Sequence, residues 1–200
     1  LDSDAIEREK ASQRTSLRET LQDPLSVAFR HLRQRLFGRH GYGIPTLGNE
    51  DSVESLSRLS LAAHHSLHVR GPNLAVALAG DFDPEEARDL LSKAFNELPE
   101  GDPWHPEPSE ILDPSEDVIH VDKKQAILAI GYPGSAALDE HRHALRMLNE
   151  WASDMAGPLF TRIREDLGLA YQVGATQFPG HDTGLFAFSM APDPAQLELA

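Results

Sequence analysis

Arg164 and Tyr171 are the residues of this chain whose types and spacing point most directly to chemistry. They lie in a stretch where a basic helix end is followed by Gly168 and then by the start of an expected strand. A guanidinium and a phenol at one glycine-broken corner can converge on one ligand, as donors to a peptide carbonyl or a developing oxyanion. Ordinary structural roles also explain both residues, because arginine suits a last helical turn and tyrosine suits a strand.

Ten histidines raise the question of a metal site. A zinc peptidase helix needs two histidines four residues apart, with a glutamate as general base. His64 and His68 have the spacing, but no glutamate lies between them. Glu140 and His141 would end an H-x-x-E-H motif, but Ala137 stands where its first histidine is needed. We therefore expect neither cluster to be a zinc site, and surface or core histidines are the simpler interpretation.

Other catalytic motifs are missing from the sequence. The chain has no cysteine and no G-x-S-x-G elbow, so nucleophilic catalysis lacks its usual residues. The glycines around Tyr42 and at position 168 match neither a dinucleotide-binding nor a phosphate-binding loop. Considered residue by residue, the chain has no self-sufficient active site.

Composition excludes two classes of partner. The 18 basic and 32 acidic residues give a net charge of −14, which argues against nucleic acid because phosphates need a basic surface. This charge would suit a basic peptide, although solubility explains it more simply. No apolar run approaches the roughly 20 residues of a membrane span.

The first half of the chain is expected to be mainly helical. Apolar periodicity and capping residues predict helices over about 3–22, with Ser3 or Asp4 as cap, and over 25–37 and 53–68. The apolar run 73–80 predicts a buried strand. Asp83, followed by a proline at the first helical position, predicts the start of a further helix.

The second half is expected to hold most of the strands. The pattern predicts strands over 118–121, 125–132, 171–178 and 184–190 and helices over 138–155 and 158–167. A turn around Gly180 would join the last two strands. Because strands and helices segregate along the chain, the predicted fold class is α+β.

Residues 99–116 are expected to form a linker, because they are rich in proline and acidic residues and contain no lysine or arginine. This predicts three parts: the end of a first domain over 1–98, the linker, and the beginning of a second domain over 117–200.

Four segments carry motifs that are specific together. They are Ile6 to Glu9 with Asp23-Pro24, the loop HGYGIPTLGNEDS at 40–52, the run NLAVALAGD at 73–81, and the corner FTRIREDLGLAYQV at 160–173. Spread over nearly the whole chain, they resemble the pitrilysin/insulinase family of zinc metallopeptidases, the inverzincins, including mitochondrial processing peptidase-like proteins. The resemblance implies paired α/β-roll domains, each an antiparallel sheet covered by helices, that close over an extended peptide. It also implies that Arg164 and Tyr171 are the family's substrate-binding or transition-state donors.

One departure from the family pattern bears on catalysis. The resemblance implies two carboxylates seven residues apart, and an ungapped count places them at Glu9 and Ser16. Glu9 is retained, but Ser16 replaces the expected third zinc ligand, and serine is a poor ligand for Zn²⁺. A shifted register would bring in Glu19 instead, at the cost of moving both flanking motifs. The H-x-x-E-H motif itself would lie upstream of position 1.

The sequence therefore predicts a non-catalytic peptidase-like domain that binds extended peptide and complements a zinc-bearing homologous subunit or a second copy. No cofactor is expected in this chain, because zinc would lie in an active partner or an upstream half. The alternatives are a fragment of an active zinc metalloendopeptidase and a scaffold subunit without peptide binding. The compartment stays open, with the bacterial periplasm or envelope suggested by family analogy alone.

Overall fold

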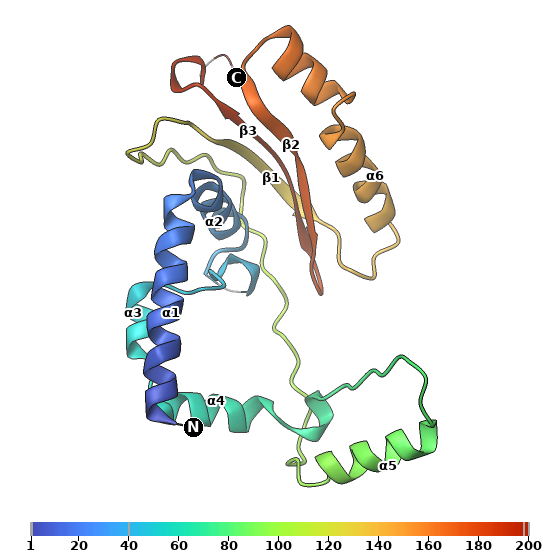
Figure 1. Ribbon diagram of the computed structural model, residues 1–200. Helices are drawn as coiled ribbons and strands as arrows, with labels where there is room; N and C mark the ends of the chain where they lie inside the picture. Colours follow the sequence, from blue (N-terminus) through green and yellow to red (C-terminus); the bar gives the residue numbers. More distant parts are fainter. Residues whose placement is uncertain (1, 40, 198, 200) are drawn as a thin grey trace. The chain divides into compact units, whose positions relative to one another are not determined.

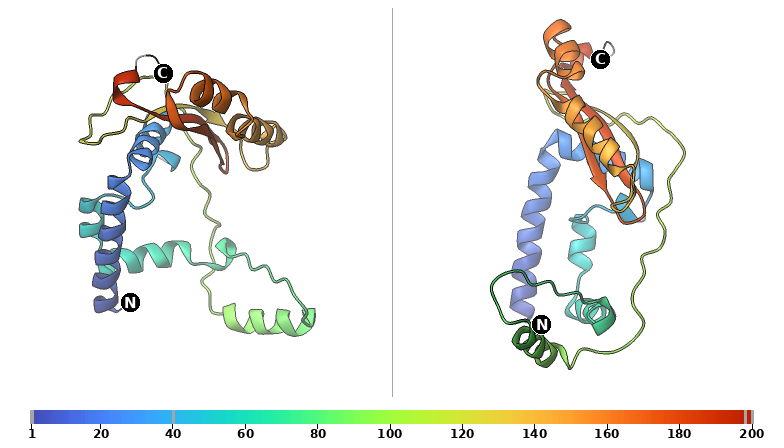
Figure 2. Two further views of the ribbon diagram at one scale, coloured as in Figure 1. Left: turned by 45° about the horizontal axis from the view of Figure 1, so that its top comes forward. Right: turned by 90° about the vertical axis from the view of Figure 1, so that its right-hand side faces the viewer.

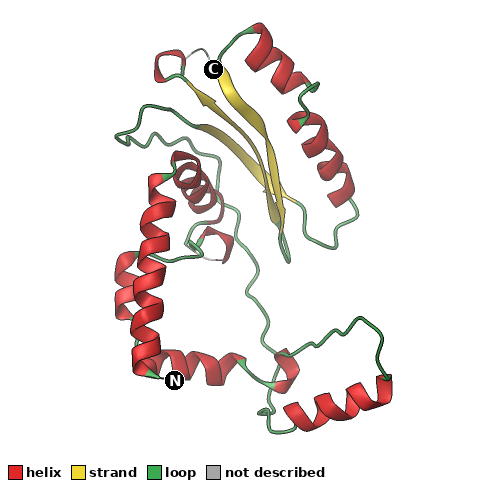
Figure 3. Ribbon diagram, in the orientation of Figure 1, coloured by secondary structure: helices red, strands yellow, loops and turns green. Residues whose placement is uncertain are grey.

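The structure is a computed structural model that describes residues 2–39, 41–197 and 199. Its internal contacts divide the chain into two compact units, and the secondary structure of both is drawn in Figure 3. The first unit comprises Leu1–Ser12 and Asp51–Glu107, and the second comprises Gln13–Glu50 and Pro108–Ala200. The predicted parts 1–98, 99–116 and 117–200 stay a prediction. His40, the first residue of the loop motif, lies outside the described residues.

The second unit contains an antiparallel sheet of three strands, β1 (Leu128–Gly134), β2 (Ala170–Pro179) and β3 (Gly184–Pro192), in the order β1-β3-β2 (Figure 1). β2 and β3 form the predicted hairpin, and the Gly180 N–H donates to Thr183 O at 2.8 Å in its turn. Helices together with an antiparallel sheet confirm the predicted α+β class.

Helix α2 (Pro24–Phe37) supplies the core beneath this sheet. Phe37 is buried against Leu185 and Ala187 of β3, with further apolar residues of α2 packed around them. At Gly131 of β1 the approach is so close that a Cβ would lie 2.8 Å from Leu32 Cδ1. A larger residue at position 131 would therefore force the Leu32 side chain of α2 to move.

Tyr42 packs between the β2–β3 hairpin and this core. Its ring lies edge-on to Phe37 and to Phe178, with centroid distances of 5.6 and 5.2 Å. Its hydroxyl accepts a hydrogen bond from the backbone N–H of His181 in the hairpin turn. One side chain thus joins the end of α2 to β2 and to the hairpin turn.

The acidic segment around residues 108–117 is also held within the second unit. The Ser109 N–H and hydroxyl both donate to the Asp182 carboxylate, and these bonds keep the pKa of Asp182 below its ordinary value. Arg35 pairs with Asp117 at 3.1 Å. The predicted strand 118–121 is wrong, because this exposed stretch has no ladder partner among the described residues.

Helix α6 (Arg142–Ser153) runs beside β2, as the two directions of Figure 2 show. It is shorter than the predicted 138–155, because Asp139 accepts from the His141 N–H at 2.7 Å in a turn that precedes the first helical residue. At the other end, the Ser153 hydroxyl donates to Ala175 O and accepts from Ala175 N. The end of α6 therefore occupies the outer edge of β2 at this residue.

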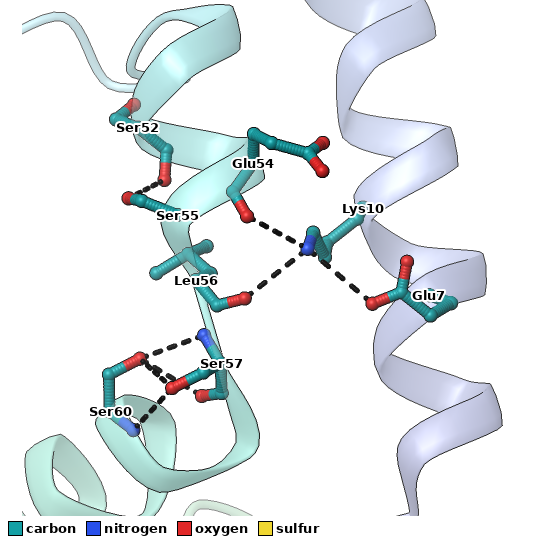
Figure 4. Close-up of polar contacts among 8 residues, drawn as sticks. All are labelled: Glu7, Lys10, Ser52, Glu54, Ser55, Leu56, Ser57 and Ser60. Atoms are coloured by element: carbon teal, nitrogen blue, oxygen red, sulfur yellow. Dashed lines mark hydrogen bonds and ion pairs between the residues drawn. The ribbon is translucent and has the colours of Figure 1, made fainter.

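The first unit shows why the predicted helix 53–68 is two helices, α3 (Glu50–Ser55) and α4 (Arg58–His68). Ser57 forms a capping box with Ser60, which starts a new helix. The buried Lys10 ammonium donates to the carbonyls of Glu54 and Leu56 at 3.0 and 3.2 Å (Figure 4). These two carbonyls at the helix break thus find a partner outside the helix.

Helix α1 (Ser3–Gln22) and helix α5 (Pro84–Phe95) appear as predicted. Asp83 caps α5 by accepting from the next two helical N–H groups, whereas the cap of α1 is Asp2 rather than Ser3 or Asp4. The predicted strand 73–80 is wrong, because residues 74–79 have no ladder partner within the described chain and are exposed. Apolar character alone does not make a strand when no second strand lies alongside.

Among the described residues, none of the helices combines the length and the apolar character that crossing a bilayer requires.

We predict that Asp23→Ala destabilises the protein by about 1 kcal/mol, the usual effect of losing an N-cap. Asp23 accepts from the N–H groups of Leu25 and Ser26 at the start of α2 and from the Ser26 hydroxyl. These bonds lower the pKa of Asp23, the Ser26 hydroxyl most. Its stabilisation is therefore present above the ordinary carboxyl pKa and is lost as the pH falls through the lowered value.

Urea unfolding at pH 7 and at acidic pH measures this effect. The difference between wild type and Asp23→Ala should shrink in acid, while Asp122→Ala, an exposed control, should stay within about 0.5 kcal/mol of wild type. A difference that does not change with pH would contradict the capping role.

Candidate functional site

The predicted corner is a π-helical turn, η3 (Phe160–Asp166), that passes through Gly168 into β2. Gly168 has φ 62°, a left-handed conformation that other residues adopt at a cost. The N–H groups of Leu167 and Leu169 close the helix end by donating to Arg162 O at 3.2 Å and Ile163 O at 2.9 Å. The chain therefore turns sharply from helix to strand between Arg164 and Tyr171.

The structure brings Arg164 and Tyr171 together. The guanidinium carbon of Arg164 lies 4.0 Å from the centre of the Tyr171 ring, within the range of a cation–π contact. Its Nη1 also approaches the Tyr171 carbonyl oxygen at 3.4 Å. Tyr171 sits where the β2–β3 register shifts between Ala170 and Val173, and its side chain is 72% exposed. Such irregularities in a ladder re-aim a side chain at the edge of a sheet.

Phe160 is a third member of this site, and we did not predict it from the sequence. Its ring lies 4.6 Å from the guanidinium carbon of Arg164, so the cation contacts two aromatic rings. The spacing of four residues between Phe160 and Arg164 on a helix was the available signal. Phe160 thus restricts the arginine side chain, which would otherwise sample many rotamers.

Apart from the bond of Arg164 Nη1 to the Tyr171 carbonyl, the side-chain donors of the pair have no partner among the described residues. Arg164 makes no ion pair with any described residue, while its helical neighbour Arg162 pairs with Asp166 at 3.4 Å. The Tyr171 hydroxyl likewise has no protein partner in the described part of the chain. A guanidinium offers a fixed fork of donors and a phenol one more, which suits a carbonyl oxygen or an oxyanion.

The positions that the resemblance assigned to the zinc site do not form one here. Glu9 and Ser16 both lie on α1, the glutamate exposed and the serine half-buried. Nowhere in the described ranges do three or more histidine, aspartate or glutamate side chains gather as a metal ion would require. Glu140 and His141 approach each other at 3.8 Å on the exposed surface. We therefore assign no step of zinc chemistry to these residues.

Comparison with known proteins relates most of this chain to one peptidase family. Residues 55–200 match the description of a peptidase M16 inactive domain. An uncharacterized zinc protease of Rickettsia bellii is 26% identical over 179 residues, which cover 88% of this chain and 43% of that protein. The chain thus spans less than half the length of this curated relative.

Solved structures show the same fold. The peptidase M16 inactive domain from Pseudomonas fluorescens superposes with a TM-score of 0.82 at 23% identity, over 98% of this chain and 48% of that one. A chain of complex III2 from Candida albicans superposes with a TM-score of 0.81 at 18% identity, over 93% and 46%. At these identities the likeness establishes the architecture.

We predict that Phe160→Leu loosens the Arg164 side chain. In the wild type the Arg164 Cδ protons should be shifted upfield in the NMR spectrum, because they lie near two aromatic rings. Phe160→Leu should move them part of the way to the random-coil position, and Tyr171→Leu should do the same. Phe82→Leu, an exposed phenylalanine of the other unit, is the control that should leave them in place. Random-coil shifts of Arg164 in the wild type would disprove the stack.

Proposed function

Because the chain belongs to the peptidase M16 family, through its match to the inactive domain of that family, we propose that it is a non-catalytic peptidase-like domain. It binds an extended peptide at Arg164 and Tyr171 and complements a zinc-bearing partner in proteolysis. The partner is a homologous subunit or a second copy whose other half holds the metal.

The observation that carries this proposal is the stacked position of the Arg164 guanidinium over Tyr171, at 4.0 Å from the ring centre. Stacking covers the face of the guanidinium, and the N–H groups other than the one bonded to the Tyr171 carbonyl stay available to a ligand in its plane. The phenol hydroxyl lies on the same exposed corner. Two donors held in fixed positions favour an oxygen that gains negative charge, and this is how an oxyanion hole acts.

A basic, extended peptide is the substrate class that the charge favours. The net charge of −14 attracts cationic chains from a distance and raises the rate at which they meet the surface. At the corner itself the ligand group is the peptide oxygen, because Arg164 would repel a cationic side chain. The net charge thus attracts the peptide, and the corner separately binds its backbone oxygen.

One alternative is that these residues are part of a longer, active zinc protease. The name of the Rickettsia bellii relative and the 43% of its length that the chain covers favour this alternative. In that case the metal ligands lie in the remainder of the protein and Arg164 and Tyr171 keep the same role. A scaffold subunit without peptide binding is the other alternative, and a titration with a basic peptide separates it from both.

We predict that Tyr171→Phe lowers the hydrolysis of a quenched fluorescent basic peptide by about 10²-fold, the usual effect of losing one transition-state donor. The assay combines the full chain with a homologous chain of the same organism that carries H-x-x-E-H. Arg164→Gln should lower the rate comparably, because it removes the other donor.

Two substitutions of the same residue types serve as controls. Tyr132→Phe changes a tyrosine of β1 that is 51% exposed, and Arg162→Gln changes the arginine that is paired with Asp166. Both should leave the rate close to that of the wild type. Absence of partner-dependent hydrolysis, or equal rates for Tyr171→Phe and Tyr132→Phe, would contradict the proposal.

A further inference from the structure

His64 and His68 lie on adjoining turns at the end of α4, in the first unit. Their ring centroids are 4.4 Å apart with an angle of 47° between the ring planes. The two imidazoles thus share one side of the helix and lie close enough to bind a single ion between them. Histidines four residues apart on a helix are the spacing by which helical sites hold a metal.

The backbone around the two rings is already hydrogen-bonded. The carbonyls of His65, Ser66 and His68 accept from Val69 N, Arg70 Nε and Asn73 Nδ2 respectively. By contrast, neither imidazole makes a hydrogen bond or an ion pair with any residue that the structure describes. The ring nitrogens are therefore the free ligand atoms at this helix end, where the helix dipole favours a cation.

Trp104 forms a wall beside this pair. Its ring lies edge-on to His68 at 5.7 Å, and its backbone N–H donates to Asn73 Oδ1 at 2.7 Å. Asn73 thus ties Trp104 to the carbonyl of His68. An open hollow of about 440 Å³ is lined by His68, Pro72, Asn73, Pro103 and Trp104, so solvent ligands have room beside the His68 imidazole.

We propose that His64 and His68 bind one late divalent transition-metal ion, with water in its remaining coordination positions. Imidazole nitrogen suits Cu²⁺, Ni²⁺ and Zn²⁺, and the affinity of such sites is highest for Cu²⁺. Two protein ligands without a carboxylate distinguish this site from a peptidase zinc centre. It lies in a different unit from Arg164 and Tyr171, and it stands or falls independently of the proposed function.

The test uses the fluorescence of Trp104, because bound Cu²⁺ quenches a nearby indole. The chain has two tryptophans, so Trp151→Phe leaves Trp104 as the reporter and Trp104→Phe leaves Trp151. Titration of the full chain with Cu²⁺ should quench Trp104 in a saturable curve. Mg²⁺, which prefers oxygen ligands, should leave the fluorescence unchanged.

In the Trp151→Phe background, His64→Ala and His68→Ala should each weaken Cu²⁺ binding on the order of 10²-fold, because a second tethered ligand adds this much to one imidazole. His65→Ala is the matched control, since it removes an imidazole from the same helix and should leave the curve unchanged. Far-UV circular dichroism should be the same for all three variants.

Two results would overturn the proposal. One is quenching of Trp104 and Trp151 to the same extent without saturation, which indicates collision with free ion. The other is that His65→Ala weakens binding as much as His64→Ala, which indicates that any histidine of the helix suffices.

Discussion

The left-handed conformation of Gly168 is the constraint on which the candidate site depends. A Cβ at this position would meet no other atom within 4 Å, so the requirement for glycine comes from φ 62° and not from crowding. This turn ends η3 and directs the chain into β2, and it thereby places Tyr171 beside Arg164. A side chain at position 168 would disfavour the conformation that lets the two donors meet.

In each compact unit, a polar side chain links segments that are distant in sequence. In the first unit, Lys10 joins α1 to the α3–α4 break through the carbonyls of Glu54 and Leu56. In the second, Tyr42 connects α2 to the β2–β3 turn through two rings and one hydrogen bond. Both side chains supply a hydrogen-bonding partner where regular structure stops, which is where backbone groups otherwise stay unpaired.

How far the sequence predicts the structure depends on the range of the interactions involved. The cap of α5, the β2–β3 hairpin and the corner at Gly168 follow from residues within a few positions of one another, and all three are confirmed. The break after Ser55 depends partly on Lys10, more than 40 positions away, and the sequence pattern cannot supply that contact. The run 73–80 failed because a strand needs a neighbour, which no local pattern guarantees.

The same distinction holds for the candidate site. The types and spacing of Arg164 and Tyr171 indicated that the two could meet, but not that Phe160 would contact the guanidinium as well. The spacing of four residues allowed that contact, but an ordinary helical pattern does not specify that η3 is a π-helix. The cluster of His68 with Trp104 likewise joins residues separated by a helix and a loop.

Under the proposed function, the chemistry of the corner calls for a second component. The guanidinium and the phenol act as hydrogen-bond donors. Hydrolysis of a peptide also requires a base or a metal ion that takes a proton from water. Ser16, where the family resemblance implies a carboxylate ligand, supplies neither of these. In the proposed function, Arg164 and Tyr171 therefore bind the peptide and stabilise its transition state, while other residues generate the nucleophile.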